Sequence, residues 1–130
     1  YIALVKGIPE NNAWQVDRSI RRKDGFVFEC CEEETGGKFA QTSFSVLTRG
    51  AKYSEIECKP LTGRTHQIRL HLLASGFPIA DDKVYLNKAP TAKLLQTTAI
   101  HLCHKKISIP SLEMDIECEL PLWWGELQLA

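Results

Sequence analysis

The sequence predicts one soluble α+β domain built mainly from antiparallel strands. Three observations lead to this fold class. Short segments in which apolar and polar residues alternate outnumber the helical segments. These strands follow one another in pairs joined by short turns, instead of alternating with long helices. The 130 residues, 44% of them hydrophobic, suffice for one buried core and leave no room for a second domain.

Four strands are predicted in the first half of the chain. Residues 1–5, YIALV, are apolar throughout, as in a strand that is covered on both faces. Residues 26–30 alternate between apolar and polar side chains, and so do residues 39–46, FAQTSFSV. Residues 53–60 repeat the pattern, and the TRGAK stretch before them predicts an antiparallel hairpin with the preceding strand.

The second half of the chain predicts another hairpin and two helices. Residues 99–109 are β-like, residues 114–120 alternate strictly, and the PSLE turn between them favours antiparallel pairing. Helices are expected at 66–75 and at 89–96, the second opening with a proline that the first helical turn tolerates.

The ends of the first helix are well marked. Thr65 is the expected N-cap, Gly76 is placed just after the C-cap, and Pro78 prevents further winding. At about 100° per residue, Leu70 and Leu73 lie on one side, whereas Ile68 and Leu72 lie on nearly the opposite side. The helix is therefore expected to pack between two layers.

Arg69 lies at a narrow seam between the two apolar stripes of this helix, so its guanidinium is crowded by apolar side chains and needs an anion. The residues alone leave two possibilities open. One is a structural carboxylate such as Asp81, Asp82 or Glu57. The other is a ligand or substrate anion, because Arg64 lies beside Gly63 just before the helix, where free backbone N–H groups favour phosphate or carboxylate.

Charge and hydropathy exclude some classes of protein. The 16 basic and 16 acidic residues cancel, so a nucleic-acid surface must come from local clustering of charge. No apolar run approaches the roughly 18 residues of a membrane span, and the first residues do not resemble a signal peptide. We therefore expect a cytoplasmic protein without a membrane partner.

Five cysteines are scattered along probable strands and form no CxxC pair, which indicates reduced core residues. A metal site would have to gather His101, Cys103 and His104 with His66 or His71. The H-x-C-H spacing on a strand points its members to opposite faces, so no metal is expected.

Residues 59–85, KPLTGRTHQIRLHLLASGFPIADDKVY, resemble the third sequence motif of the RluA-type RNA pseudouridine synthases. That pattern is approximately L-x-T-G-R-x-H-Q-I-R-x-H-(x)-G-x-P-I-x-G-D-x-x-Y. YIALVKG at 1–7 is similar to the tyrosine-containing strand of the family, and residues 98–110 resemble its later L-H-A strand. One small departure is Asp81, which stands where the family usually has glycine.

The resemblance implies isomerisation of uridine to pseudouridine in rRNA or tRNA, with no added cofactor. In this family the reaction needs a carboxylate nucleophile, proton transfer and control of charge. Arg69 matches the arginine that pairs with the catalytic aspartate. Tyr1 matches the tyrosine that stacks on the target base and is proposed to assist removal of the C5 proton. The alternative for Tyr1 is a core tyrosine of the strand.

Further roles follow from the same resemblance. Arg64, His66 and Gln67 are assigned to RNA phosphate contact or to orienting the site, and His66 is as well explained as a structural hydrogen-bond partner. Lys59 is expected to contact RNA close to the active centre. His71 points away from Arg69 and is taken as structural.

RNA as the partner would also contact the basic runs 18–23 and 104–106, unless these are merely solvated strand edges. Asp82 and Tyr85 follow the G-D-x-x-Y stretch of the family and are expected to support the site.

One departure from the family is large, because no H-R-L-D-x-x-T-S-G string, which carries the nucleophilic aspartate, occurs in the chain. Residues 1–130 are therefore expected to be the C-terminal portion of a catalytic domain, with a missing N-terminal part as its partner. Residues 1–130 by themselves would then be inactive. The alternative is a non-catalytic RNA-binding protein or RNA chaperone with the same fold.

Overall fold

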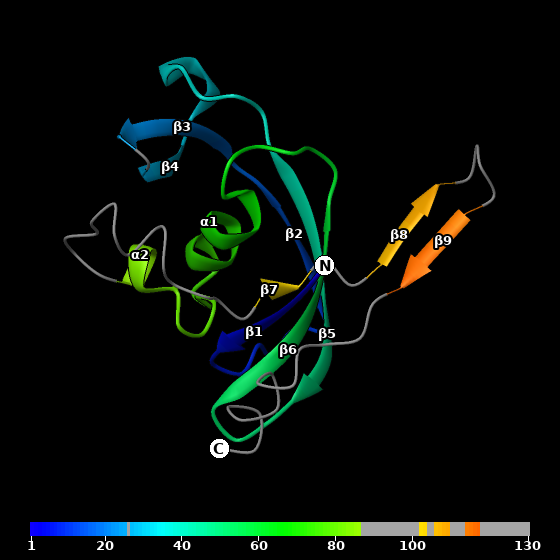
Figure 1. Cartoon of the computed structure of the whole chain (residues 1–130). Helices are drawn as coiled ribbons and strands as arrows, with labels where there is room; N and C mark the ends of the chain where they lie inside the picture. The colour runs from blue at the N-terminus through cyan, green and yellow to red at the C-terminus, as the bar shows by residue number, and fades with distance from the viewer. Residues whose placement is uncertain (26, 87–101, 104–105, 110–113, 118–130) are drawn as a thin grey trace.

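The computed structural model describes residues 1–25, 27–86, 102–103, 106–109 and 114–117. An antiparallel sheet with strand order β2-β5-β6-β1-β7 forms its centre (Figure 1). Its strands are β1 (Ile2–Lys6), β2 (Ala13–Asp17), β5 (Gln41–Arg49), β6 (Tyr53–Pro60) and β7 (Leu102–Cys103).

The remaining elements are short. They are the hairpin strands β3 (Ser19–Asp24) and β4 (Val27–Cys31), the 3₁₀ turn η1 (Glu33–Thr35), the helices α1 (Gln67–Ala74) and α2 (Lys83–Leu86), and the second hairpin formed by β8 (Lys106–Ile109) and β9 (Met114–Glu117). In Figure 1, α1 lies between the central sheet and the β3–β4 hairpin.

Helix α1 is buried on two sides, as its two apolar stripes predict. Ile68 and Leu72 pack into the main core with side chains of the sheet such as Phe44. Leu70 packs on the other side, against Ile20 of β3. The burial of these side chains removes the apolar surface from water and fixes which residues of α1 face outward.

Strand β1 is covered on both faces, which confirms the prediction for YIALV. Ala3 and Val5 belong to the main core, whereas Ile2 and Leu4 pack on the opposite face with Ala80. Ala80 reaches this position because its backbone N–H donates to the Leu4 carbonyl at 2.9 Å. Residues 78–80 thus run along the edge of β1 that β7 leaves open.

The predicted hairpin of 39–46 with 53–60 is confirmed as β5 and β6, which pair with Phe44 opposite Cys58. The strand predicted at 26–30 corresponds to β4. Of the stretch 99–109, residues 106–109 form β8 and pair with β9, the described part of 114–120, whereas residues 102–103 form β7 and pair with β1 in the central sheet. The helix expected at 89–96 lies outside the described residues. Strands β2 and β3 and helix α2 were not predicted.

The expected cap of α1 is corrected by the structure, whereas its C-terminal end is confirmed. His66, and not Thr65, is the N-cap residue, and its φ of 55° lies in the left-handed region without a side-chain capping bond. The Gln67 side chain instead accepts the N–H of Arg64 at 3.0 Å. Gly76 follows the C-cap with a φ of 88°, a conformation that glycine adopts freely.

The four described cysteines are free thiols, in agreement with the sequence interpretation. Cys31 and Cys58 are buried, and burial raises the pKa of Cys58 to about 12. A thiol with such a pKa stays protonated at neutral pH, which suits a role in the core. Cys118 lies outside the described residues.

Candidate active site

A cleft of about 380 Å³ lies where the start of β1, the end of β6, the loop into α1 and strand β7 meet. We call it the Tyr1 cleft. Its described lining consists of Tyr1, Pro60, Thr62, Gly63, Arg64, His66, Gln67, Ile68, Arg69 and Leu102. The structure therefore brings five of the six predicted site residues to one place. The sixth, Lys59, is exposed on β6 and does not line the cleft.

Tyr1 is anchored by its backbone. Its amino group donates to the Cys58 carbonyl at 3.0 Å, and its own carbonyl accepts the Cys58 N–H at 2.8 Å. Its side chain is half-buried and packs against the main core while it lines the cleft. The position is compatible with both interpretations of Tyr1, a core tyrosine and a stacking surface for a base.

Arg69 has a carboxylate partner within the chain, which is Asp82. Nε donates to Oδ2 at 2.8 Å and Nη2 donates to Oδ1 at 2.6 Å. The Arg69 side chain is 13% exposed and that of Asp82 is 2% exposed. Among the alternatives that the sequence left open, the structural carboxylate is the one seen, and the pair is bidentate and nearly dry.

This pairing uses only part of the guanidinium. Nη1 of Arg69 makes no hydrogen bond to any residue that the structure describes. The Arg69 carbon Cζ also lies 4.9 Å from the centre of the Tyr85 ring. Arg69 lines the Tyr1 cleft and Asp82 does not, so the ion pair holds the arginine at the wall of the cleft.

The backbone conformation just before Asp82 accounts for the glycine that the family pattern has at position 81. Asp81, which stands in its place, has a φ of 62°. Glycine adopts this left-handed conformation without cost, and aspartate is among the residues that tolerate it. Asp81 can therefore adopt the left-handed conformation that this turn requires.

His66 is held by the phenol of Tyr85. The distance from His66 Nδ1 to Tyr85 Oη is 2.6 Å, and the same oxygen accepts the Phe28 N–H at 3.3 Å. The tautomer of the imidazole decides whether Nδ1 or the phenol supplies the shared hydrogen, because a phenol oxygen can both donate and accept. Burial, and after it the Arg69 charge, lowers the pKa of His66. The ring is thus neutral at neutral pH and fixed in orientation.

Gln67 is 4% exposed and forms four hydrogen bonds within the protein. Its Nε2 group donates to the Gln41 carbonyl and to Thr42, and its Oε1 atom accepts from Thr62 and from the Arg64 N–H. Of its two suggested roles, orienting the site is therefore the one that the geometry supports, because no donor remains for a phosphate.

His71 is fully buried and structural, as its direction on the helix predicts. Its Nε2 atom is 2.8 Å from the Arg18 carbonyl, which can only accept, so this nitrogen carries the hydrogen. The Thr42 hydroxyl then donates to Nδ1 at 2.7 Å. Burial lowers the pKa of His71.

Arg64 is exposed at the mouth of the cleft. Its Nε donates to the Phe39 carbonyl at 2.8 Å, and its terminal nitrogens have no acceptor among the described residues. Lys59 is 3.3 Å from Glu57, and its side chain is 75% exposed, so this ion pair contributes little. In the other basic runs, His104 and Lys105 lie outside the described residues, whereas residues 18–23 mostly belong to β3.

Sequence reasoning missed Thr62, Leu102 and Phe28. Thr62 connects Gln67 to the Gln41 N–H, and Phe28 contacts the His66 ring edge-to-face at 5.8 Å. Only Thr62 had a signal in the sequence, because it opens the T-G-R turn before the helix. The other two reach the site from strands that are distant along the chain.

No group of three potential metal ligands is found among the described residues, and His101 and His104 lie outside them. Within the same residues, no helix combines the length and the apolar composition that crossing a membrane requires.

The stability of the fold is expected to decrease when the pH falls below about 6.5. In the unfolded chain both histidines take up protons near the ordinary pKa of 6.5, whereas in the fold their lowered pKa values keep them neutral. The unfolded state then binds more protons, so stability is full above pH 6.5 and is lost as the pH falls toward the folded values. For the fully buried His71 the slope is at most about 1.4 kcal/mol per pH unit.

Urea unfolding at a series of pH values measures this slope. The variant His66→Gln removes one of the two titrating groups and should flatten the curve. Stability that stays constant between neutral and mildly acidic pH would contradict the assignment of neutral, hydrogen-bonded imidazoles.

Comparison with known proteins finds similarity to RNA pseudouridine synthases. The family model described as RNA pseudouridylate synthase matches residues 1–74. RNA pseudouridine synthase 7 of Oryza sativa subsp. japonica is 34% identical over 122 residues, which are 88% of this chain and 31% of that protein. The mitochondrial tRNA pseudouridine(32) synthase of Saccharomyces cerevisiae is 50% identical over 58 residues, which are 45% of this chain and 13% of that protein. The chain thus spans less than a third of the length of these relatives.

A solved structure shares the fold. Human RNA Pseudouridylate Synthase Domain Containing 4 superposes with a TM-score of 0.73 at 23% sequence identity, covering 95% of this chain and 57% of that one.

Proposed function

This chain belongs to the RNA pseudouridylate synthase family, and from that premise we propose that it forms part of an enzyme that isomerises uridine to pseudouridine in rRNA or tRNA. The observation that carries the proposal is the Tyr1 cleft, in which an aromatic side chain and the Arg69 guanidinium line the same space. A flipped uracil needs such a surface for stacking and a fixed cation near the reacting carboxylate.

The proposed chemistry balances without a cofactor. The nucleophilic carboxylate would bond to ribose C1′ as the bond from C1′ to N1 of the base breaks. The base turns, and C5 then displaces the carboxylate from C1′ to form the new C1′–C5 bond. C5 then loses its proton and N1 gains one, so no oxidant or reductant takes part. Tyr1 would stack on the base and assist removal of the C5 proton. Arg69, which lines the cleft, would keep the nucleophilic carboxylate ionised.

The nucleophile is proposed to come from outside residues 1–130. No Asp or Glu lines the described part of the Tyr1 cleft. Asp82 is unsuited, because it is 2% exposed and both of its oxygens accept from Arg69. We therefore place the chain as the C-terminal portion of a catalytic domain, whose N-terminal part would add the aspartate. The partial coverage of its relatives supports this placement.

A second candidate is a non-catalytic RNA-binding protein. One observation favours it, which is that Arg69 already has a carboxylate partner in Asp82. The upstream reading frame separates the two candidates, since an H-R-L-D motif before Tyr1 belongs only to the enzyme. For either candidate we propose a cytoplasmic location, supported by the free cysteines.

Release of tritium from RNA labelled at uridine C5 tests the enzyme directly. The protein translated from the complete reading frame is expected to release tritium from rRNA or from tRNA, whereas residues 1–130 alone should release none. A complete protein that is inactive on both RNA classes would contradict the proposed activity. Turnover by residues 1–130 alone would contradict the external nucleophile.

A further inference from the structure

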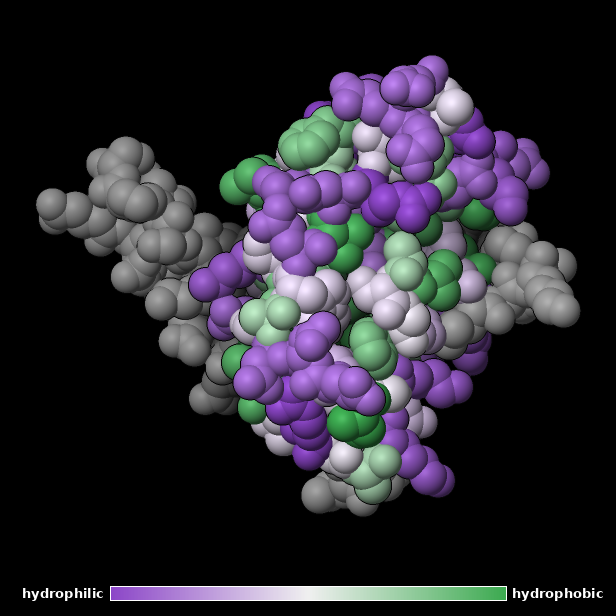
Figure 2. Space-filling model, turned by 180° about the vertical axis from the view of Figure 1, so that it is seen from behind, coloured by the Kyte–Doolittle hydropathy of each residue, from purple (hydrophilic) through white to green (hydrophobic). Residues whose placement is uncertain are grey.

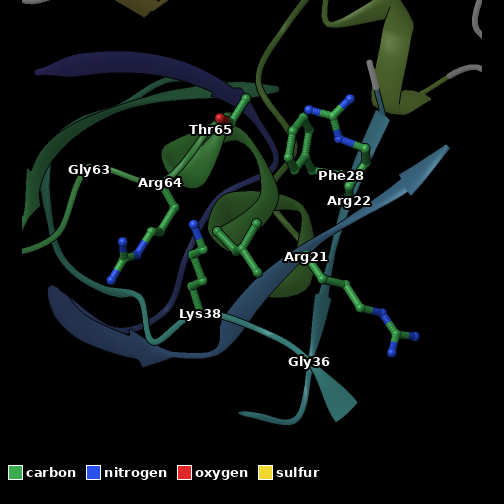
Figure 3. A pocket seen from close by; sticks show the side chains of 9 residues that line it. Arg21, Arg22, Phe28, Gly36, Lys38, Gly63, Arg64 and Thr65 are labelled. Carbon is green, nitrogen blue, oxygen red and sulfur yellow. The ribbon is translucent and has the colours of Figure 1, made fainter. Parts of the chain in front are cut away.

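A second pocket, of about 350 Å³, lies between the β3–β4 hairpin, the loop after η1 and the loop into α1 (Figure 3). We call it the basic pocket. Its described lining consists of Ile20, Arg21, Arg22, Phe28, Gly36, Lys38, Gly63, Arg64 and Thr65, which includes four cationic and no acidic residues. Figure 2 shows hydrophilic side chains gathered at this end of the molecule.

Three of the four cations form no ion pair with a carboxylate of the residues that the structure describes. Arg21 is the exception, because its Nε lies 2.9 Å from Glu29, and in Figure 3 its side chain extends away from the other three. Arg22 donates to the Gly25 carbonyl and lies over the Phe28 ring at 5.3 Å. Lys38 is exposed and has neither a hydrogen bond nor an ion pair from its ammonium group to any described residue.

Two of these three cations, Arg22 and Arg64, are held in place, on a chain whose formal net charge is zero. Arg22 is positioned by its carbonyl acceptor and by the Phe28 ring, and Arg64 is positioned by the Phe39 carbonyl. Figure 3 shows Lys38 projecting into the space between Arg64 and the Phe28 ring. A zero net charge gives no long-range attraction, so these cations provide a local site for an anion.

The basic pocket adjoins the Tyr1 cleft. Gly63 and Arg64 line both. A Cβ atom added at Gly63 would meet nothing within 4 Å, so the backbone there is uncovered. An extended ligand can therefore pass from one pocket to the other directly over Gly63.

We propose that the basic pocket binds the backbone phosphates of a single RNA strand next to the uridine whose base enters the Tyr1 cleft. This inference rests on the proposed function and assigns to Arg22 and Lys38 a contact with substrate. A polynucleotide with one base flipped out presents both parts at once, since its base suits the Tyr1 cleft and its phosphodiesters suit the three cations. Lys38 and Arg22 contact phosphate, and Arg64 contacts the linkage that crosses Gly63.

The salt dependence of RNA binding tests the phosphate contacts. The complete protein with Arg22→Gln and Lys38→Gln is compared with a control that carries Lys6→Gln and Lys52→Gln. All four side chains are exposed, and the control pair removes the same charge from residues that line neither pocket. The probe is a short single-stranded oligoadenylate with one central uridine, and binding is followed by fluorescence anisotropy.

Loss of two phosphate contacts should reduce the slope of log K against log salt by about 1.4, equivalent to about 25-fold weaker binding at 0.1 M salt if affinities converge at 1 M. The control should keep the parent slope. Equal slopes for the two double variants would overturn the proposal. Circular dichroism melts check that both variants fold.

A neutral methylphosphonate linkage tests the position of the contact. Placed next to the uridine, it should weaken binding by the parent protein and leave binding by the Arg22 and Lys38 double variant unchanged. An equal loss for both proteins would place the phosphate contact elsewhere and refute the inference.

The two proposals fail in different ways. RNA binding with the expected slope change but without tritium release would contradict the isomerase and leave the basic pocket standing. Tritium release with unchanged salt slopes would contradict the basic pocket and leave the isomerase standing.

Discussion

Replacing Arg69 with methionine is expected to abolish pseudouridine formation and to lower the free energy of unfolding by about 3–5 kcal/mol. The activity is lost because the nucleophilic carboxylate loses its counter-charge, and the stability is lost because Asp82, 2% exposed, keeps a buried charge without a partner. RNA binding should change much less, since the phosphate contacts are made by other residues. Tritium release, RNA affinity and urea unfolding of the complete protein measure the three effects.

The double variant Arg69→Met with Asp82→Leu separates activity from stability. Replacing both members of a buried ion pair with apolar residues of similar size is often neutral or stabilising. Stability should therefore return while turnover stays absent. A stable double variant with the turnover of the parent would show that Arg69 serves the fold alone, and would remove the main support for its catalytic role.

Replacing Tyr1 with phenylalanine is expected to lower turnover by about 10²- to 10⁴-fold while leaving RNA affinity unchanged. The ring that would stack on the base is kept, whereas the hydroxyl that would assist proton removal is lost. Tritium release at saturating RNA measures the effect on turnover, and fluorescence anisotropy measures the affinity.

Tyr53→Phe is the matched control. Tyr53 is also a half-buried tyrosine, but it packs with Ile2, Leu4 and Ala80 on the other face of the sheet and does not line the cleft. It should leave turnover unchanged. If Tyr1→Phe behaves in the same way as this control, Tyr1 is a core residue of the strand and the proposed proton transfer is wrong.

The strands with clear period-2 patterns could be predicted from the sequence, and those without such a pattern could not. β5 and β6 bury alternate side chains such as Thr42, Phe44, Ile56 and Cys58, and this alternation is visible in the residues. β3 buries only Ser19 and Ile20 and leaves charged side chains on the rest, so SIRRKD looks like a solvated basic run. Its strand conformation depends on pairing with β4, and this tertiary contact is not visible in its own residue pattern.

The candidate site was predictable where it depends on helical geometry and unpredictable where it depends on tertiary contacts. The spacing along α1 placed Arg69 at a seam between apolar stripes, and Asp82 was one of three carboxylates considered as its structural partner. The choice between them is made by the turn after Ala80, which the backbone bond to Leu4 holds beside β1. The burial of Gln67 likewise depends on Gln41 and Thr42 of a distant strand.

The position of β1 has a consequence for how the chain folds. Ile2 pairs with Glu57 on one side and with Cys103 on the other. Strand β1 can therefore pair only after residues far along the chain have been synthesised. Contacts of such high sequence separation form only when long loops close, and loop closure costs conformational entropy. The domain should therefore fold more slowly than a helical bundle of equal length, and only after most of it has left the ribosome.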